Sequence, residues 1–321
     1  MRSWIPLFLL LSCCLMHAQE RPVTADGPVL ARPDTTLCFA QRDTCDLMLD
    51  FYAAAPAAGP CADSLRKPVI IHVFGGAFLT GRRNHPDDLG WYRQLADAGY
   101  HVAAIDYRLG LKGVQIKFGL AAVHTFEGAI QMAVDDLYAA TNYLLDHAEE
   151  LAIDPDRIIV SGSSAGAITA LQAEWEIING KAPARALPGW FNYAGIMAFA
   201  GAVLSTDGAV VYPQKPCPTL LLHGTADRIV PYRQISIPGM QLAGSDVLAR
   251  KMRTAGADVQ IYRYKDVGHE VAVTMARNLP EELRFLEENV IKGIRRPLDA
   301  TIEDALLPDM GWKRLSFANL Y

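Results

Sequence analysis

Short apolar runs alternate along the chain with longer segments in which apolar residues recur at helical spacing. Runs with the length of strands buried on both faces span residues 67–74, 101–107, 157–161, 197–203, 218–224 and 259–264. Helical spacing is found in residues 86–98, 126–148, 165–178, 242–255 and 279–291. This alternation predicts an α/β fold, with a mostly parallel central sheet and helices on both of its faces.

Other segments depart from this pattern. In residues 45–52 apolar and polar positions alternate, which predicts a half-buried strand paired with residues 35–39 as a hairpin. Glycine, lysine and proline interrupt the helical pattern in an insertion at about 179–195. The tail, residues 295–321, has no strong period, and we expect its apolar side chains to dock on the body of the protein. These are Trp312, Leu315, Phe317 and Leu320.

The first 18 residues resemble a secretory signal peptide. Arg2 precedes a leucine-rich run over residues 4–16, and Ala18 offers a small residue at a cleavage position. A lipobox-like Leu-Leu-Ser-Cys ending at Cys13 keeps a lipoprotein possible, and a buried N-terminal helix is the third alternative. We expect a secreted or periplasmic protein, with residues 19–321 forming a single domain.

Composition limits the function further. The chain has 321 residues, of which 51% are hydrophobic and 20% charged, which suits one large α/β domain. A formal net charge of −5 argues against a nucleic-acid partner, and no later apolar run approaches the length of a membrane span. We expect no cofactor and no metal, because the cysteines and histidines do not cluster at ligand spacing.

Four cysteines remain once the predicted signal is removed: Cys38, Cys45, Cys61 and Cys217. In an exported protein they can form disulfides. The hairpin makes a bridge between Cys38 and Cys45 plausible, which leaves Cys61 with Cys217. Four free thiols are the alternative.

The strongest chemical motif is Gly162-Ser163-Ser164-Ala165-Gly166, placed between a predicted strand and a predicted helix. Such a sharp turn raises the hydroxyl of Ser164 above the sheet and aims the backbone N–H of Ala165 at whatever the serine attacks. A serine that only caps the helix is the alternative interpretation.

Two later strand ends supply the groups that a serine nucleophile needs. Asp227 follows the run at 218–224 and His269 follows the run at 259–264. An imidazole can act as the base for Ser164, and a carboxylate can hold its tautomer and balance its charge. Asp266 and Asp207 are alternatives for the acid, in poorer positions. The chain order serine, aspartate, histidine supports the first assignment.

With these motifs the chain resembles the α/β-hydrolases, close to the branch of carboxylesterases and feruloyl or acetyl-xylan esterases. The resemblance covers residues 69–291 and includes residues 74–78, 106–109 and 223–231 besides the serine and histidine motifs. It implies an oxyanion hole formed by the N–H groups of Gly76 and Ala165, with Gly75 or Ala77 as a further donor. The family usually has histidine before the paired glycines, where this chain has Phe74; His72 lies two residues earlier, on the same face of a strand.

The predicted function is a serine hydrolase that cleaves small-molecule or carbohydrate esters through an acyl-enzyme. Two alternatives remain: a serine peptidase resembling the catalytic domain of prolyl oligopeptidases, and a catalytically silent binding protein on the same fold. Aromatic residues of the insertion, Trp190 and Phe191, could line a substrate pocket. The sequence does not determine the oligomeric state.

Overall fold

The computed structural model describes residues 31–56, 58–115 and 120–316. The predicted signal segment with Cys13 and Ala18, and the tail residues Phe317 and Leu320, lie outside the described residues, so these predictions remain open.

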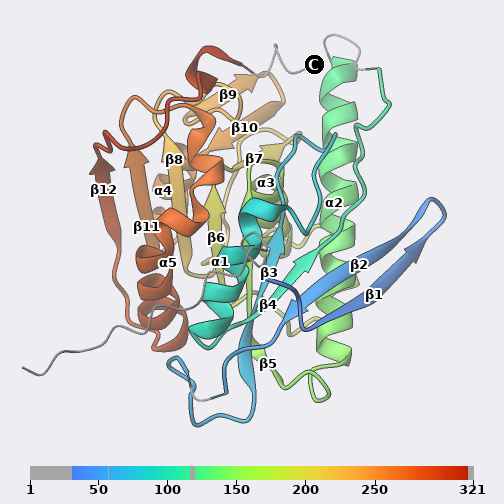
Figure 1. Ribbon diagram of the computed structural model, residues 1–321. Coiled ribbons are helices and arrows are strands. Elements are labelled where there is room, and N and C mark those ends of the chain that lie inside the picture. Colours follow the sequence, from blue (N-terminus) through green and yellow to red (C-terminus); the bar gives the residue numbers. More distant parts are fainter. Residues whose placement is uncertain (1–30, 57, 116–119, 317–321) are drawn as a thin grey trace, which may run out of the picture. The chain divides into compact units, whose positions relative to one another are not determined.

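A large sheet organises the described part of the chain (Figure 1). Its order is β1 (Thr35–Arg42), β2 (Cys45–Tyr52), β4 (His101–Ile105), β3 (Lys67–Val73), β5 (Ile153–Ser163), β6 (Gly195–Phe199), β8 (Thr219–Gly224), β11 (Val259–Tyr264) and β12 (Leu298–Ile302). Strands β1 and β2 form the predicted antiparallel hairpin, and β2 pairs antiparallel with β4. From β4 to β12 every pairing is parallel. The predicted α/β class is therefore confirmed.

Helices cover both faces of this sheet. The described residues form five α-helices: α1 (Pro86–Asp97), α2 (Leu120–Asp146), α3 (Ala165–Ile178), α4 (Ser245–Thr254) and α5 (Leu279–Phe285), the last continued by a π-helical turn at Leu286–Ile291. One apolar layer joins α2, α3 and α4 to the side chains of Val69, Ile71 and Val73 on β3. The other joins α1 and α5 to the face that carries Ile70. Within the described residues, no helix combines the length and apolarity needed to cross a bilayer.

The prediction of one strand over residues 197–203 is wrong. The chain breaks at Ala200, whose φ is +57°, between β6 and β7 (Ala202–Ser205). Strand β7 leaves the large sheet and pairs with β10 (Met240–Gly244), which pairs in turn with β9 (Gln234–Ile237). The break lies under α3, because a Cβ on Gly201 would come within 2.9 Å of the Ala167 side chain.

The predicted disulfides are absent, and the four cysteines are free thiols. In the hairpin register Cys38 faces Met48 and Cys45 faces Arg42, so the two cysteines are four positions apart along β1. At about 3.3 Å per residue this separation exceeds the reach of a disulfide. Cys61 lies beside Arg157 of β5, and Cys217 lies beside Glu174 of α3, so the second pair is also held apart.

Helix α3 carries a buried carboxyl group. Glu174 has no exposed surface, and its Oε1 accepts hydrogen bonds from the Cys217 N–H at 2.8 Å and from Asn192 at 3.5 Å. Burial raises the pKa of Glu174 to about 7, although these hydrogen bonds oppose the shift. The folded protein therefore keeps a proton on this side chain that the unfolded chain releases near pH 4.5.

This difference predicts a loss of stability as pH rises. Between about pH 4.5 and 7 the folded state binds more protons than the unfolded state, so the free energy of unfolding falls. The substitution Glu174→Gln removes the titrating group and with it this pH dependence. Above pH 7 the free energy of unfolding of the variant should rise by up to about 3 kcal/mol relative to that of wild type. Urea unfolding at a series of pH values measures it. The exposed Glu150→Gln serves as control, and parallel curves for wild type and Glu174→Gln would contradict the account.

Candidate active site

Ser164 lies at a sharp corner between β5 and α3. Its φ of +50° and ψ of −116° are rare for a residue with a side chain. Hydrogen bonds hold this conformation on both sides, because the Ser164 N–H donates to the Phe199 carbonyl at 2.8 Å and the Ile168 N–H donates to the Ser164 carbonyl at 2.9 Å. The corner is the sharp turn that the sequence predicted.

Close backbone contacts explain the two flanking glycines. A Cβ on Gly166 would lie 1.9 Å from the Val73 carbonyl oxygen, at the end of β3. A Cβ on Gly162 would lie 2.3 Å from the Gly166 carbonyl oxygen. Neither space can hold a methyl group, so only glycine lets α3 begin directly against β3 and β5.

The structure brings the three predicted side chains together. His269 Nε2 lies 2.7 Å from Ser164 Oγ, and His269 Nδ1 lies 2.7 Å from Asp227 Oδ2. Asp227 follows β8, and His269 opens a 3₁₀ turn (His269–Val273) after β11, so both stand at carboxyl ends of parallel strands. Both are buried, with exposed fractions of 5% and 6%. The alternative acids do not join them, since Asp207 pairs with Lys181 and Asp266 is exposed.

Asp227 is surrounded by hydrogen-bond donors. The N–H groups of Ile229 and Val230 donate to Oδ1 at 2.9 and 3.1 Å, and His223 Nε2 lies 3.2 Å from Oδ2. Burial alone would raise the pKa of Asp227, but the hydrogen bonds from His223 and His269 hold it well below its usual range. The carboxyl group is therefore ionised.

An ionised Asp227 sets the proton positions on both imidazoles. His269 Nδ1 donates to the carboxylate, which leaves Nε2 free to accept the proton of Ser164. On His223, Nε2 faces two acceptors, the Asp227 carboxylate and the Val230 carbonyl, so it must carry the hydrogen. Our sequence analysis assigned no role to His223; its signal was a histidine four residues before the acid at the end of a buried strand.

The glycine loop after β3 lies beside Ser164. Gly76 and Ala77 line a cavity together with Ser164, and a Cβ on Gly75 would come within 3.2 Å of the Ser164 Cβ. Ala77 and Phe78 have φ values of +57° and +60°, so the loop holds two consecutive residues in the left-handed region. Ala165 is the first residue of α3, where an N–H has no partner within the helix.

Phe74 and His72 lie on opposite faces of the sheet, so the expectation that they share a face is wrong. Strand β3 ends at Val73, where the alternation stops. The Phe74 ring stacks on Tyr107 with centroids 4.4 Å apart, and the Tyr107 hydroxyl donates to the Phe74 carbonyl. His72 packs on Trp91 and Tyr92 instead, and burial lowers its pKa to about 3. Tyr107, rather than His72, therefore braces this loop.

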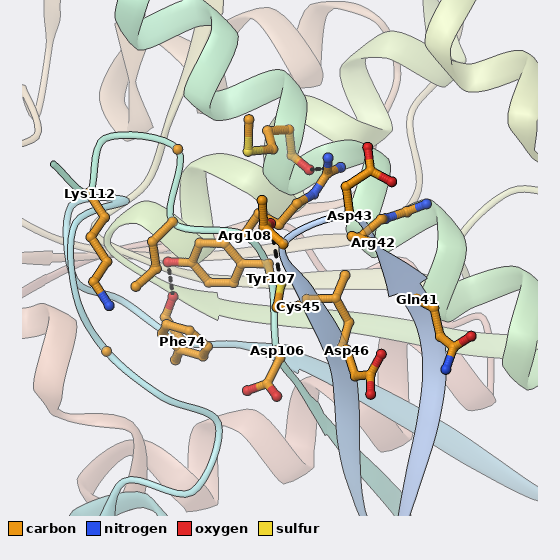
Figure 2. Close-up of a pocket in the computed structure, with 16 residues that line it drawn as sticks. Gln41, Arg42, Asp43, Cys45, Asp46, Phe74, Asp106, Tyr107, Arg108 and Lys112 are labelled. Atoms are coloured by element: carbon orange, nitrogen blue, oxygen red, sulfur yellow. Dashed lines mark hydrogen bonds between the residues drawn. The ribbon is translucent and has the colours of Figure 1, made fainter. Parts of the chain in front are cut away.

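A cavity larger than the one lined by Ser164 and the glycine loop lies away from the three residues. It leaves about 910 Å³ for the centres of water-sized groups, between the turn joining β1 to β2 and residues 106–112 (Figure 2). Three of its six charged side chains form ion pairs: Arg42 and Arg108 pair with Asp136, and Asp106 pairs with Arg83. Size alone therefore does not mark the site. Among the described residues, no group of three or more His, Cys, Asp or Glu side chains could hold a metal ion.

Part of the chain is similar in sequence to known proteins. Residues 58–176 match the family model described as BD-FAE. A probable isoprenylcysteine alpha-carbonyl methylesterase of Arabidopsis thaliana, ICMEL1, is 28% identical over 164 residues, which are 51% of this chain and 30% of that protein. Esterase LipI of Mycobacterium tuberculosis is 34% identical over 107 residues, or 33% of this chain and 28% of that protein. The chain thus spans less than a third of the length of these curated relatives.

Solved structures identify the fold. The esterase Est2 of Thermogutta terrifontis superposes with a TM-score of 0.57 at 19% identity, covering 82% of this chain and 94% of that one. Further structures of Est2 show it bound to propionate and phosphorylated by paraoxon. The described part of this chain therefore has the α/β-hydrolase fold.

Two glycine-to-alanine substitutions, one at the corner and one on α1, should have opposite effects on stability. In Gly166→Ala the new methyl group meets the β3 backbone, so we expect a loss of several kcal/mol of unfolding free energy or failure to fold. In Gly90→Ala, on α1, nothing lies within 4 Å of the new atom, and the variant should gain about 0.5–1 kcal/mol. Urea unfolding compares them; a Gly166→Ala protein as stable as wild type would refute the close contact.

Proposed function

We propose that this chain, an α/β-hydrolase by fold, is a serine esterase that cleaves carboxylic esters through an acyl-enzyme. The observation that carries the proposal is the line of two 2.7 Å hydrogen bonds from Ser164 through His269 to Asp227. The esterase names of ICMEL1, LipI and Est2 support the choice of an ester as substrate.

In the first half-reaction Ser164 Oγ attacks the ester carbonyl carbon, and its proton passes to His269 Nε2. The new bond between Oγ and carbon converts the carbonyl oxygen into an oxyanion. The resulting imidazolium is stabilised by the Asp227 carboxylate, which stays ionised because of its donors. His269 then gives the proton to the alcohol oxygen as the bond between that oxygen and carbon breaks.

In the second half-reaction water replaces the alcohol. His269 Nε2 removes a proton from the water, whose oxygen attacks the acyl carbon. When the bond from carbon to Oγ breaks, Ser164 recovers its proton from His269 and the carboxylic acid leaves. No cofactor takes part in these steps.

The developing oxyanion needs donors that are already in place. We assign this role to the N–H groups of Ala165, at the start of α3, and Gly76, in the loop beside Ser164. Gly75 has a different role in this proposal: without a side chain, it lets the loop approach Ser164 closely enough. Each donor of this kind is worth about 3 kcal/mol in the transition state.

Kinetics of p-nitrophenyl acetate hydrolysis test the proposal. Ser164→Ala should lower kcat by about 10⁴-fold or more, and Asp227→Asn by about 10³–10⁴-fold because His269 loses its correct tautomer. Asp266→Asn is the matched control. Asp266 follows β11, as His269 does, but it is exposed, and His269 Nδ1 bonds to Asp227 instead. Circular dichroism verifies that the variants fold. Hydrolysis retained by Ser164→Ala would exclude Ser164 as the nucleophile.

A further inference from the structure

Two cavities of very different size meet at Ser164. The smaller leaves about 20 Å³ for the centres of water-sized groups, and Phe78, Phe126, Ile168 and Leu242 are among its walls. The larger leaves about 390 Å³, and it is lined by His269, Trp312 and Leu315 besides the glycine loop. An ester bound at Ser164 must place its acyl group in one and its alcohol in the other.

The position of His269 decides which cavity takes which part. The alcohol oxygen receives its proton from His269 Nε2, so the leaving alcohol must lie on the side of the imidazole. His269 lines the larger cavity and is not part of the smaller one. The acyl group therefore extends into the small cavity, beside Ala165 and Ile168.

The small cavity limits the length of the acyl chain. One water-sized group needs roughly 10–15 Å³ of such space, so about 20 Å³ holds one or two. Its walls are closely packed, because Phe78 is fully buried, Ile168 is 3% exposed, and the rings of Phe78 and Phe126 meet edge to face with centroids 5.7 Å apart. The space therefore fits the methyl or ethyl group of an acetyl or propionyl ester.

The C-terminal tail forms one wall of the larger of the two cavities at Ser164. The backbone N–H of Trp312 donates to the buried carboxyl group of Glu270 at 2.8 Å, and the centroid of the Trp312 ring lies 6.0 Å from that of the His269 ring. The tail crosses directly over Gly268, where a Cβ would come within 2.4 Å of the backbone nitrogen of Lys313. This contact gives a physical reason for glycine immediately before His269.

The chemistry of these walls selects the alcohol. Thr80 adds one hydroxyl group to the polar side chains of Ser164 and His269. The other side chains that line this cavity are apolar. A sugar would lose hydrogen bonds to water here without replacing them, whereas a ring-sized apolar alcohol would bury its surface against Trp312 and Leu315.

We propose that this enzyme acts on acetyl or propionyl esters of bulky apolar alcohols, and that Trp312 of the C-terminal tail holds the alcohol. The inference rests on the proposed esterase function and adds its substrate class. Trp190, considered for the substrate pocket in the sequence analysis, is 66% exposed and lines neither cavity.

Kinetics with 1-naphthyl acetate, 1-naphthyl hexanoate and acetylated xylose test the acyl and alcohol sides separately. Wild type should prefer naphthyl acetate to naphthyl hexanoate at least 10-fold in kcat/KM, and to acetylated xylose by a similar factor. Ile168→Ala, or Phe126→Ala if the first variant fails to fold, should raise the ratio of hexanoate to acetate about 10-fold.

Trp312→Ala should raise KM for naphthyl acetate about 10-fold and leave the acyl preference unchanged. Trp190→Ala, which removes an exposed tryptophan, should change neither value. Equal rates for acetate and hexanoate, or an unchanged KM in Trp312→Ala, would overturn the inference while leaving the esterase function intact. Absence of hydrolysis of all three esters by wild type would overturn both proposals.

Discussion

The contact between Gly166 and the end of β3 is the constraint on which the site depends. Because α3 begins against the Val73 carbonyl, the chain must turn within one residue, and that residue, Ser164, takes a conformation that side chains rarely adopt. The same contact places the glycine loop that follows β3 next to the serine. One steric requirement thus brings the proposed nucleophile and the proposed oxyanion donors together, before any hydrogen bond of the site is considered.

Electrostatics then fixes the proton positions. Asp227 is almost fully buried, and its ionised form is maintained by the donors around it, among them His223 from the same strand end. A carboxylate held in this way makes His269 donate through Nδ1, which leaves Nε2 as the base. The C-terminal tail is also tied to the site. Glu270, the neighbour of His269, accepts a hydrogen bond from the backbone of Trp312, whose side chain lines the larger of the two cavities at Ser164.

The strand ends were predictable from sequence because each motif is local. Ser164, Asp227 and His269 each follow a short apolar run, and in a parallel sheet such positions meet at one edge. The small sheet and β12 were missed, since β7, β9 and β10 are short and depend on pairing between distant segments. The cavity walls were missed for the same reason: Phe126, Leu242 and Trp312 come from separate parts of the chain. The expected bridge between Cys38 and Cys45 is absent because hairpin register, which spacing does not determine, decides which residues face each other; the alternative of free thiols agrees with the structure.

The most direct test of this account is to trap the nucleophile. The full chain is treated with a fluorophosphonate, digested and mapped by mass spectrometry. We predict one adduct, on Ser164, that is lost in Ser164→Ala and forms at least 100-fold more slowly in His269→Ala. An adduct on the neighbouring Ser163 with Ser164 unmodified, or equal labelling of wild type and His269→Ala, would contradict it.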